Sequence, residues 1–169
     1  MPIIAFTGKK KSGKSKAAEY LIKNCFTPIN FKDALIDEIK DNFPNLLKEL
    51  SKIYQMDIDK LFEEKPPIMR TLIQNYGTDV RRKDNKDYWV NKWLNKTLKV
   101  KNIVVDDCRF LNEAQAVRTY NGKIYRINRR GCGGDKHQSE TEMDKIKVDG
   151  EIDNNSELKN LYKQLDLLI

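Results

Sequence analysis

Apolar residues follow two different patterns along this chain. In some short segments neighbouring residues are all apolar, as in the run IIAF near the start, which is typical of a strand buried on both faces. In longer segments apolar residues recur every three or four positions, which is typical of an amphipathic helix. The first pattern, with some less regular segments, predicts strands at residues 2–7, 27–31, 103–105, 123–128 and 147–152. The second predicts helices from about residue 13 and over residues 33–42, 46–54, 68–78, 87–98, 110–119 and 156–168.

Strands and helices therefore alternate, with Pro44 expected to separate two helices and Pro66-Pro67 expected to end any preceding element. This order predicts an α/β fold, with a mostly parallel five-stranded sheet between two layers of helices. At 169 residues the chain is long enough to bury a sizeable core, and we expect one domain over residues 1–169.

Composition narrows the class of protein. Hydrophobic residues make up 39% of the chain and charged residues 34%, and no stretch has the length of a membrane span. The first residues do not form a secretory signal, so we expect a cytoplasmic protein. The three cysteines are too few and too scattered for a disulfide framework or a zinc site. The net charge of +7 suits either nucleic acid or a small polyphosphate as partner.

The segment GKKKSGKS, residues 8–15, fits the phosphate-binding P-loop pattern G-x-x-x-x-G-K-[ST] between a strand and a helix. Gly8 and Gly13 allow successive backbone N–H groups to point at phosphate oxygens, and the helix N-terminus adds positive potential. Lys14 is expected to reach the β- and γ-phosphates of ATP, and the Ser15 hydroxyl to bind Mg²⁺. The residues expected to bind ATP here are Gly8, Lys11, Ser12, Gly13, Lys14, Ser15 and Lys16.

A second candidate element is the segment IVVDDCRF, residues 103–110, in which two aspartates follow the buried strand. An acidic residue at such a strand end can hold Mg²⁺ or its water ligands. Asp106 and Asp107 point in alternate directions, so only one of them should face the site. The segment NKTL, residues 95–98, lacks the aspartate of a GTPase base-reading motif, and a motor or helicase usually needs a larger domain.

Arginines are frequent after the P-loop, where they can clamp phosphates and neutralise transition-state charge. Arg129 and Arg130 open a polar segment over about residues 129–144 that contains several glycines. Its form predicts a hinged lid, which would exclude water so that ATP is not lost to hydrolysis.

Several segments together resemble the bacteriophage-type deoxynucleoside monophosphate kinases, within the P-loop nucleoside monophosphate kinase fold. The resemblance runs nearly end to end and is most specific in two central blocks. The segments that carry it are IAFTGKKKSGKS, FKDALIDEI, MRTLIQNYGTDVRRKDNKDYWV, VVDDCRFLNEA, INRRG with DKHQSE, and DGEIDNNSELKNL.

The resemblance implies roles around ATP. It favours Asp107 over Asp106 as the metal-side carboxylate, and it places Arg109 on phosphate or against Asp107. Arg130 would be the lid arginine nearest the transferred phosphoryl group, with Arg129 as its alternate. Asn154 would lie near the adenine, and the lid histidine, His137, would make a hydrogen bond.

The resemblance also implies a helical insert over about residues 33–98 that binds the acceptor. Within it, Asp33 begins the substrate-side helix, Arg70 would bind the acceptor phosphate, and Gln74 would bind its base or sugar. Trp89 is interpreted either as a core residue or as a pocket wall that stacks on a base. Ile36 departs from the family, which often has lysine at this place.

These features predict an enzyme that transfers the γ-phosphoryl of ATP, with Mg²⁺, to a deoxynucleoside monophosphate. Another small-molecule P-loop kinase, such as one acting on dephospho-coenzyme A, remains an alternative. A nucleic-acid-associated ATP-binding protein is a third possibility, but the aromatic residues are not interleaved in a basic stripe as a stacking groove requires. The resemblance makes a homodimer plausible, and small nucleotides are the expected partners.

Overall fold

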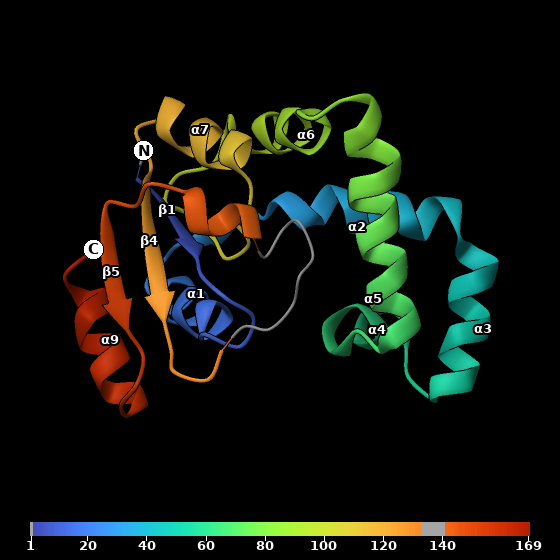
Figure 1. Cartoon of the computed structure of the whole chain (residues 1–169), viewed down its shortest axis with the longest axis horizontal. Helices are drawn as coiled ribbons and strands as arrows, with labels where there is room; N and C mark the ends of the chain where they lie inside the picture. Colours follow the sequence, from blue (N-terminus) through green and yellow to red (C-terminus); the bar gives the residue numbers. More distant parts are fainter. Residues whose placement is uncertain (1, 133–140) are drawn as a thin grey trace. The chain divides into compact units, whose positions relative to one another are not determined.

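The computed structural model describes residues 2–132 and 141–169, and it contains a five-stranded sheet in the order β2-β3-β1-β4-β5. The strands are β1 (Ile3–Thr7), β2 (Thr27–Pro28), β3 (Ile103–Val105), β4 (Lys123–Asn128) and β5 (Gly150–Asp153). Every neighbouring pair is parallel, with Ile4 of β1 opposite Val104 of β3 on one side. This confirms the predicted α/β fold, with a sheet that is parallel throughout (Figure 1).

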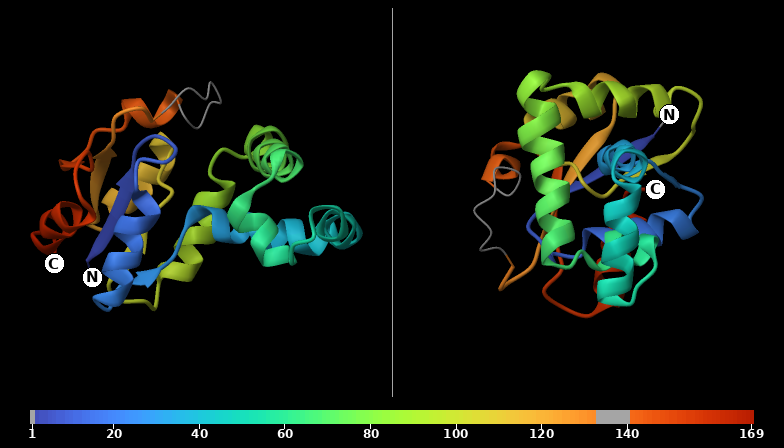
Figure 2. Two further views of the ribbon diagram at one scale, coloured as in Figure 1. Left: turned by 90° about the horizontal axis from the view of Figure 1, so that it is seen from below. Right: turned by 90° about the vertical axis from the view of Figure 1, so that its right-hand side faces the viewer.

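Helices cover both faces of this sheet (Figure 2). Because side chains alternate along a strand, Ile4 and Phe6 of β1 point to one face, where they join a buried cluster with Leu21 and Leu161. These two leucines belong to α1 (Lys14–Lys23) and α9 (Leu158–Asp166). Helix α7 (Leu111–Thr119) contacts β4 on the opposite face.

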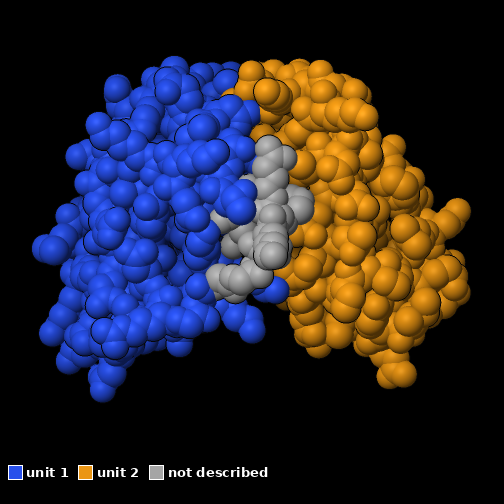
Figure 3. Space-filling model, in the orientation of Figure 1, with its two compact units in different colours: residues 1–31, 93–169 blue, residues 32–92 orange. Residues whose placement is uncertain are grey.

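The chain divides into two compact units, drawn in different colours in Figure 3. Unit 1 comprises residues 1–31 and 93–169 and holds the sheet, and unit 2 comprises Lys32–Lys92. Unit 2 is helical, and its buried cluster includes Ile39, Leu47, Leu61, Met69 and Trp89. Its elements are α2 (Phe31–Asn42), α3 (Pro44–Tyr54), α4 (Ile58–Glu64), α5 (Pro67–Gln74), the π-helix η1 (Asn75–Arg82) and the start of α6 (Tyr88–Thr97).

Local chemistry explains where unit 2 departs from the predicted elements. Pro44 separates two helices as predicted, but it lies in the first turn of α3, because a proline there has no N–H to leave unpaired. Helix α4 was not expected, and its start is fixed by Asp57, whose side chain accepts a 2.8 Å hydrogen bond from the Lys60 N–H. The predicted helix 68–78 is instead an α-helix that continues as a π-helix.

Unit 1 differs from prediction at three segment ends. Strand β2 stops at Pro28, and α2 begins already at Phe31. Strand β5 begins at Gly150 rather than at residue 147. The end of the predicted lid loop forms the short 3₁₀ helix η2 (Glu142–Lys145), because Met143 is buried there with 1% exposure. Within the described ranges, no helix has the length and apolar character needed to cross a membrane.

Candidate functional site: the P-loop and its surroundings

The loop between β1 and α1 needs glycine at both ends for steric reasons. Gly8 has a φ of 131°, and a Cβ there would lie 2.5 Å from the backbone oxygen of Ile127. Gly13 has a φ of 110°, and a Cβ there would collide with the side-chain nitrogen of Asn154. Any other residue would therefore be strained in its backbone and would also clash with the wall of the loop. The two glycines of the motif are thus required by the shape of the loop itself.

Lys14 crosses the inside of the loop. Its ammonium donates hydrogen bonds to the backbone oxygens of Gly8 at 2.6 Å and of Lys9 at 2.8 Å, and the residue is only 8% exposed. The Ser12 hydroxyl is buried nearby and has no hydrogen-bond partner among the described residues. Buried polar atoms without a partner are rare in folded proteins, so this hydroxyl fits a ligand that brings its own oxygen atoms. A phosphate group meets that requirement.

Three other residues predicted around ATP have different surroundings. Asn154 braces the loop, since its side-chain nitrogen donates to the Ser12 backbone oxygen at 2.7 Å. Lys11 is exposed and has a φ of 68°, so it helps to turn the loop. The Lys16 ammonium pairs with Glu19 at 2.7 Å on the exposed side of α1. This pair raises the pKa of Lys16 through its hydrogen bond and charge.

The two adjacent aspartates make different contacts, as their alternation predicts. The Ser15 hydroxyl donates to Asp106 Oδ2 at 2.9 Å, so Asp106 is the carboxylate that contacts the P-loop serine. Asp107 is 8% exposed, and its Oδ1 accepts the Phe31 N–H at 3.1 Å where α2 begins. The resemblance to the phage-type kinases favoured Asp107 for the metal, whereas these contacts favour Asp106.

The Ser15 and Asp106 pair fits Mg²⁺ chemically. Mg²⁺ prefers oxygen ligands and commonly binds proteins through one or two carboxylates, completing its shell with water and substrate phosphates. A serine hydroxyl and a carboxylate oxygen 2.9 Å apart supply two such oxygens at the edge of the loop. When bound, Mg²⁺ would offset negative charge on the phosphates of ATP.

A cavity of about 460 Å³ lies beside the P-loop within unit 1. Gly8 and Ser12 line it from the loop, and Arg129 and Arg130 line it from the chain after β4. The structure therefore brings both predicted lid arginines to the same cavity as the loop. Arg130 is anchored through its backbone N–H, which donates to Asn155 at 2.6 Å, while its side chain is exposed.

Lys9 and Arg126 also line this cavity, and sequence reasoning gave neither of them an individual role. The Lys9 ammonium pairs with Asp144 of η2 at 2.5 Å. The Arg126 guanidinium donates to the backbone oxygens of Met143 at 3.1 Å and Ile146 at 2.9 Å. Together these contacts fix η2 beside the loop. Little in the sequence indicates them, because Arg126 donates to backbone carbonyl oxygens, which every residue carries.

The remaining predicted residue of unit 1 is Arg109, which is half-buried after β3. Its backbone N–H donates to Glu113 of α7 at 2.8 Å. His137 and the rest of residues 133–140 of the predicted lid lie outside the described residues.

In unit 2, Arg70 and Gln74 lie one turn apart on α5, and both are half-buried. Asp33 lies in the first turn of α2, where a negative charge interacts favourably with the helix dipole. Trp89 is 2% exposed, and its indole N–H donates to the Gly77 backbone oxygen at 2.9 Å. A ring buried in this way fits the core interpretation, and the role of Trp89 as a pocket wall that stacks on a base stays a prediction.

Comparison with known proteins agrees with this geometry. A family model described as deoxynucleotide monophosphate kinase matches residues 47–165. A protein of Acanthamoeba polyphaga mimivirus named "Putative deoxynucleotide monophosphate kinase" is 32% identical over 189 aligned positions, which span 98% of this chain and 94% of that protein.

Solved structures show the same fold at low sequence identity. Shikimate kinase from Aquifex aeolicus matches with a TM-score of 0.52 and 16% identity, covering 98% of this chain and 95% of that one. The protein TT1252 from Thermus thermophilus matches with the same TM-score, identity and coverage. The sheet topology and the phosphate-binding loop together identify this chain as having a P-loop kinase fold. The chain belongs to the deoxynucleotide monophosphate kinase family, which makes it a nucleotide kinase and confirms the resemblance seen in the sequence.

Proposed function

We propose that this protein transfers the γ-phosphoryl group of ATP to a deoxynucleoside monophosphate, giving a deoxynucleoside diphosphate and ADP. The observation that carries the proposal is the P-loop of unit 1, where a buried ammonium and an unpartnered buried hydroxyl converge inside a glycine-bounded turn. Family membership supports the choice of nucleotide acceptor.

In this proposal each group around the loop has one task. The backbone N–H groups of the loop hold the ATP phosphates, and Lys14 stabilises charge on the transferred group. Ser15 and Asp106 would hold Mg²⁺, and Asp107 positions the start of α2 through the Phe31 N–H. Arg129 and Arg130, which line the cavity, would neutralise charge that spreads over the phosphoryl oxygens in the transition state.

On the acceptor side, Arg70 is assigned to the phosphate and Gln74 to the base or sugar, with Arg109 assigned to a phosphate and Asp33 to the start of the substrate-side helix. Positioning supplies most of the remaining rate enhancement, because transfer between phosphates needs little covalent help from the protein. A cytoplasmic location and a homodimer complete the proposal. Family membership does not favour the alternative of a dephospho-coenzyme A kinase.

A coupled ADP-release assay tests this reaction. Wild type, Lys14→Ala and Arg70→Ala are each given ATP·Mg²⁺ with each common deoxynucleoside or ribonucleoside monophosphate. We expect release stimulated by at least one deoxynucleotide and lost in both variants. Release that no nucleotide acceptor stimulates would contradict the proposed acceptor, and full activity in Arg70→Ala would contradict its assignment to the acceptor phosphate.

A further inference from the structure

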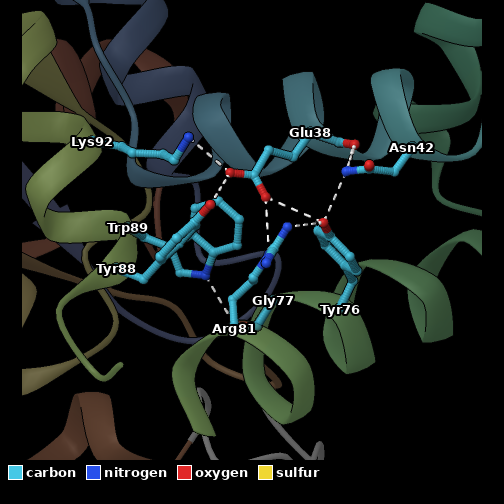
Figure 4. Close-up of polar contacts among 8 residues, drawn as sticks. All are labelled: Glu38, Asn42, Tyr76, Gly77, Arg81, Tyr88, Trp89 and Lys92. Atoms are coloured by element: carbon cyan, nitrogen blue, oxygen red, sulfur yellow. Dashed lines mark hydrogen bonds and ion pairs between the residues drawn. The ribbon is translucent and has the colours of Figure 1, made fainter. Parts of the chain in front are cut away.

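A second group of charged residues lies in unit 2, away from the P-loop in sequence and outside the roles assigned above. We call it the Glu38 cluster, and Figure 4 shows its side chains converging from α2, η1 and α6. Its members are Glu38, Asn42, Tyr76, Arg81, Tyr88 and Lys92.

The Glu38 carboxylate has its hydrogen-bond acceptor capacity fully used. Glu38 Oε1 accepts from the Tyr88 hydroxyl and from the Lys92 ammonium, the latter at 2.8 Å. Glu38 Oε2 accepts from the Tyr76 hydroxyl at 3.2 Å and from Arg81 Nε at 3.1 Å. An ionised carboxylate offers about four lone-pair sites, so these contacts leave Glu38 no acceptor capacity for a ligand.

The Tyr76 hydroxyl is occupied in the same way. Besides donating to Glu38, it accepts from Arg81 Nη2 at 2.8 Å and from the Asn42 side chain at 3.0 Å. The two cations of the cluster keep donor capacity. Arg81 Nη1 makes no hydrogen bond to any described residue, and within those residues the Lys92 ammonium forms an ion pair with Glu38 alone. Since the two side chains are 36% and 41% exposed, an incoming acceptor can reach them.

The charges of the cluster also do not cancel. Arg81 and Lys92 both form their ion pair with Glu38, and neither pairs with another acid in the described part of the chain. Burial opposes ionisation of Glu38, but hydrogen bonds from Lys92 and Tyr88 outweigh it, and the net result is a lowered pKa. With Glu38 ionised, two cations share one anion, which leaves one excess positive charge. The missing partner is an anion that only accepts hydrogen bonds.

The π-helix fixes the direction of Arg81. In a π-helix, hydrogen bonds join residues five apart, so Arg81 lies one turn beyond Tyr76 and can reach its hydroxyl. The guanidinium carbon lies 5.2 Å from the ring centres of both Tyr76 and Tyr88, which holds the charged group between two aromatic faces. Such π-helical turns occur frequently at functional sites, and here one presents a pre-oriented guanidinium.

We propose that Arg81 and Lys92 join Arg70, assigned above, in binding the phosphate of the nucleoside monophosphate acceptor, with Glu38 as the residue that positions Arg81 and Lys92. The identity of this ligand rests on the proposed function. A phosphate monoester carries the missing negative charge and only accepts hydrogen bonds when ionised. The free edge of the guanidinium suits the planar, paired hydrogen bonds that arginine makes with phosphate oxygens.

Calorimetric titration of the full chain tests the site. The four common deoxynucleoside monophosphates and their deoxynucleosides are titrated into wild type, Arg81→Gln, Lys92→Gln and the control Lys83→Gln. Lys83 is an exposed cation at the end of η1 and has no place in the cluster, so it controls for loss of general positive charge. We expect Arg81→Gln to weaken monophosphate binding at least about tenfold while leaving deoxynucleoside binding unchanged. Lys92→Gln should act in the same direction, and Lys83→Gln should change neither.

Equal loss of monophosphate and deoxynucleoside binding, or no loss in either cluster variant, would overturn the site. If Arg81→Gln unfolds, as circular dichroism would reveal, Lys92→Gln alone decides. A wild type that binds neither any monophosphate nor inorganic phosphate would also overturn it. Failure of the proposed function looks different, because wild type would then bind a monophosphate through Arg81 without releasing ADP from ATP. Conversely, full kinase activity with an unchanged KM for the acceptor in Arg81→Gln would reject the site alone.

Discussion

The P-loop and the Glu38 cluster both concentrate positive charge, but they are built from different parts of the chain. The P-loop is one continuous segment whose shape comes from two glycines and whose donors are largely backbone. The Glu38 cluster is assembled from side chains on three helices, and a π-helix sets the direction of its arginine. A site made of backbone can be recognised in a short motif, whereas a site made of distant side chains requires the fold.

The largest effect should come from removing the charge inside the P-loop. We predict that Lys14→Ala lowers kcat at least about 100-fold, because it removes a charged donor aimed at the developing phosphoryl charge. Steady-state kinetics with ATP and the preferred deoxynucleotide measures this loss. Lys23→Ala, on the exposed last turn of the same helix, is the control and should keep its activity. Similar rates in wild type and Lys14→Ala would remove the loop from the chemistry.

The shape of the loop can be tested separately from its charge. We predict that Gly8→Ala lowers the free energy of unfolding by about 2 kcal/mol and weakens ATP binding, because its Cβ meets the Ile127 backbone oxygen in a strained conformation. The matched variant is Gly131→Ala, where φ is 71° but no atom of the described residues lies within 4 Å of the new Cβ. Urea denaturation should show a loss of only about 1 kcal/mol for that variant. Equal losses would mean that the close approach to Ile127 is unimportant.

Asp106 and Asp107 provide a contrast within one strand end. We predict that Asp106→Asn raises the Mg²⁺ concentration needed for half-maximal activity about tenfold, because the variant loses the negatively charged oxygen that lies beside the Ser15 hydroxyl. Asp107→Asn should instead lower the free energy of unfolding by about 1 kcal/mol, because the Phe31 N–H keeps only a neutral partner. Activity titrated with Mg²⁺ and urea denaturation separate the two. A larger Mg²⁺ shift in Asp107→Asn would restore the assignment that the sequence favoured.

The smallest effect concerns the pH dependence of unit 2. Because the pKa of Glu38 is lowered in the folded chain, its ionised form stabilises the fold above the unfolded-state pKa near 4.5. This contribution is lost as the pH falls through the lowered folded-state pKa. We therefore predict that Glu38→Gln is less stable than wild type at pH 7 and that the difference shrinks below about pH 4.

Urea denaturation between about pH 3 and about pH 7 measures how the stability difference between wild type and Glu38→Gln changes with pH. Glu49→Gln is the matched control, because Glu49 forms only an exposed ion pair with Lys52 and should change little at any pH. A constant difference between wild type and Glu38→Gln across the range would show that the charge of Glu38 does not contribute.

The sheet and the P-loop were predictable because each leaves a local pattern in the sequence, which helix α4 and the π-helix do not. Strands buried on both faces are continuous apolar runs, and the glycines of the loop are fixed by local backbone geometry. Helix α4 escaped prediction because it is short and its cap, Asp57, is a residue equally common in turns. The π-helix could not be predicted, since NYGTDVRR also fits an ordinary helix end.

The candidate site followed the same division. Ser15 and an adjacent aspartate were predictable from the strand end, but alternation alone could not say which aspartate faces the loop. Asn154, which was expected near the adenine, also braces the loop backbone, and that contact depends on β5 lying next to β4. Lys9, Asp144 and Arg126 meet only because η2 folds back beside the loop, and no residue pattern encodes that return.

The most direct test of the proposed reaction follows the transferred atom itself. Wild type is incubated with Mg²⁺, each deoxynucleoside monophosphate and ATP labelled with ³²P in its γ-phosphate, and the products are separated by thin-layer chromatography. We predict that the label appears in the deoxynucleoside diphosphate. Label that appears only in inorganic phosphate, or that stays in ATP with every acceptor, would contradict phosphoryl transfer to a deoxynucleotide.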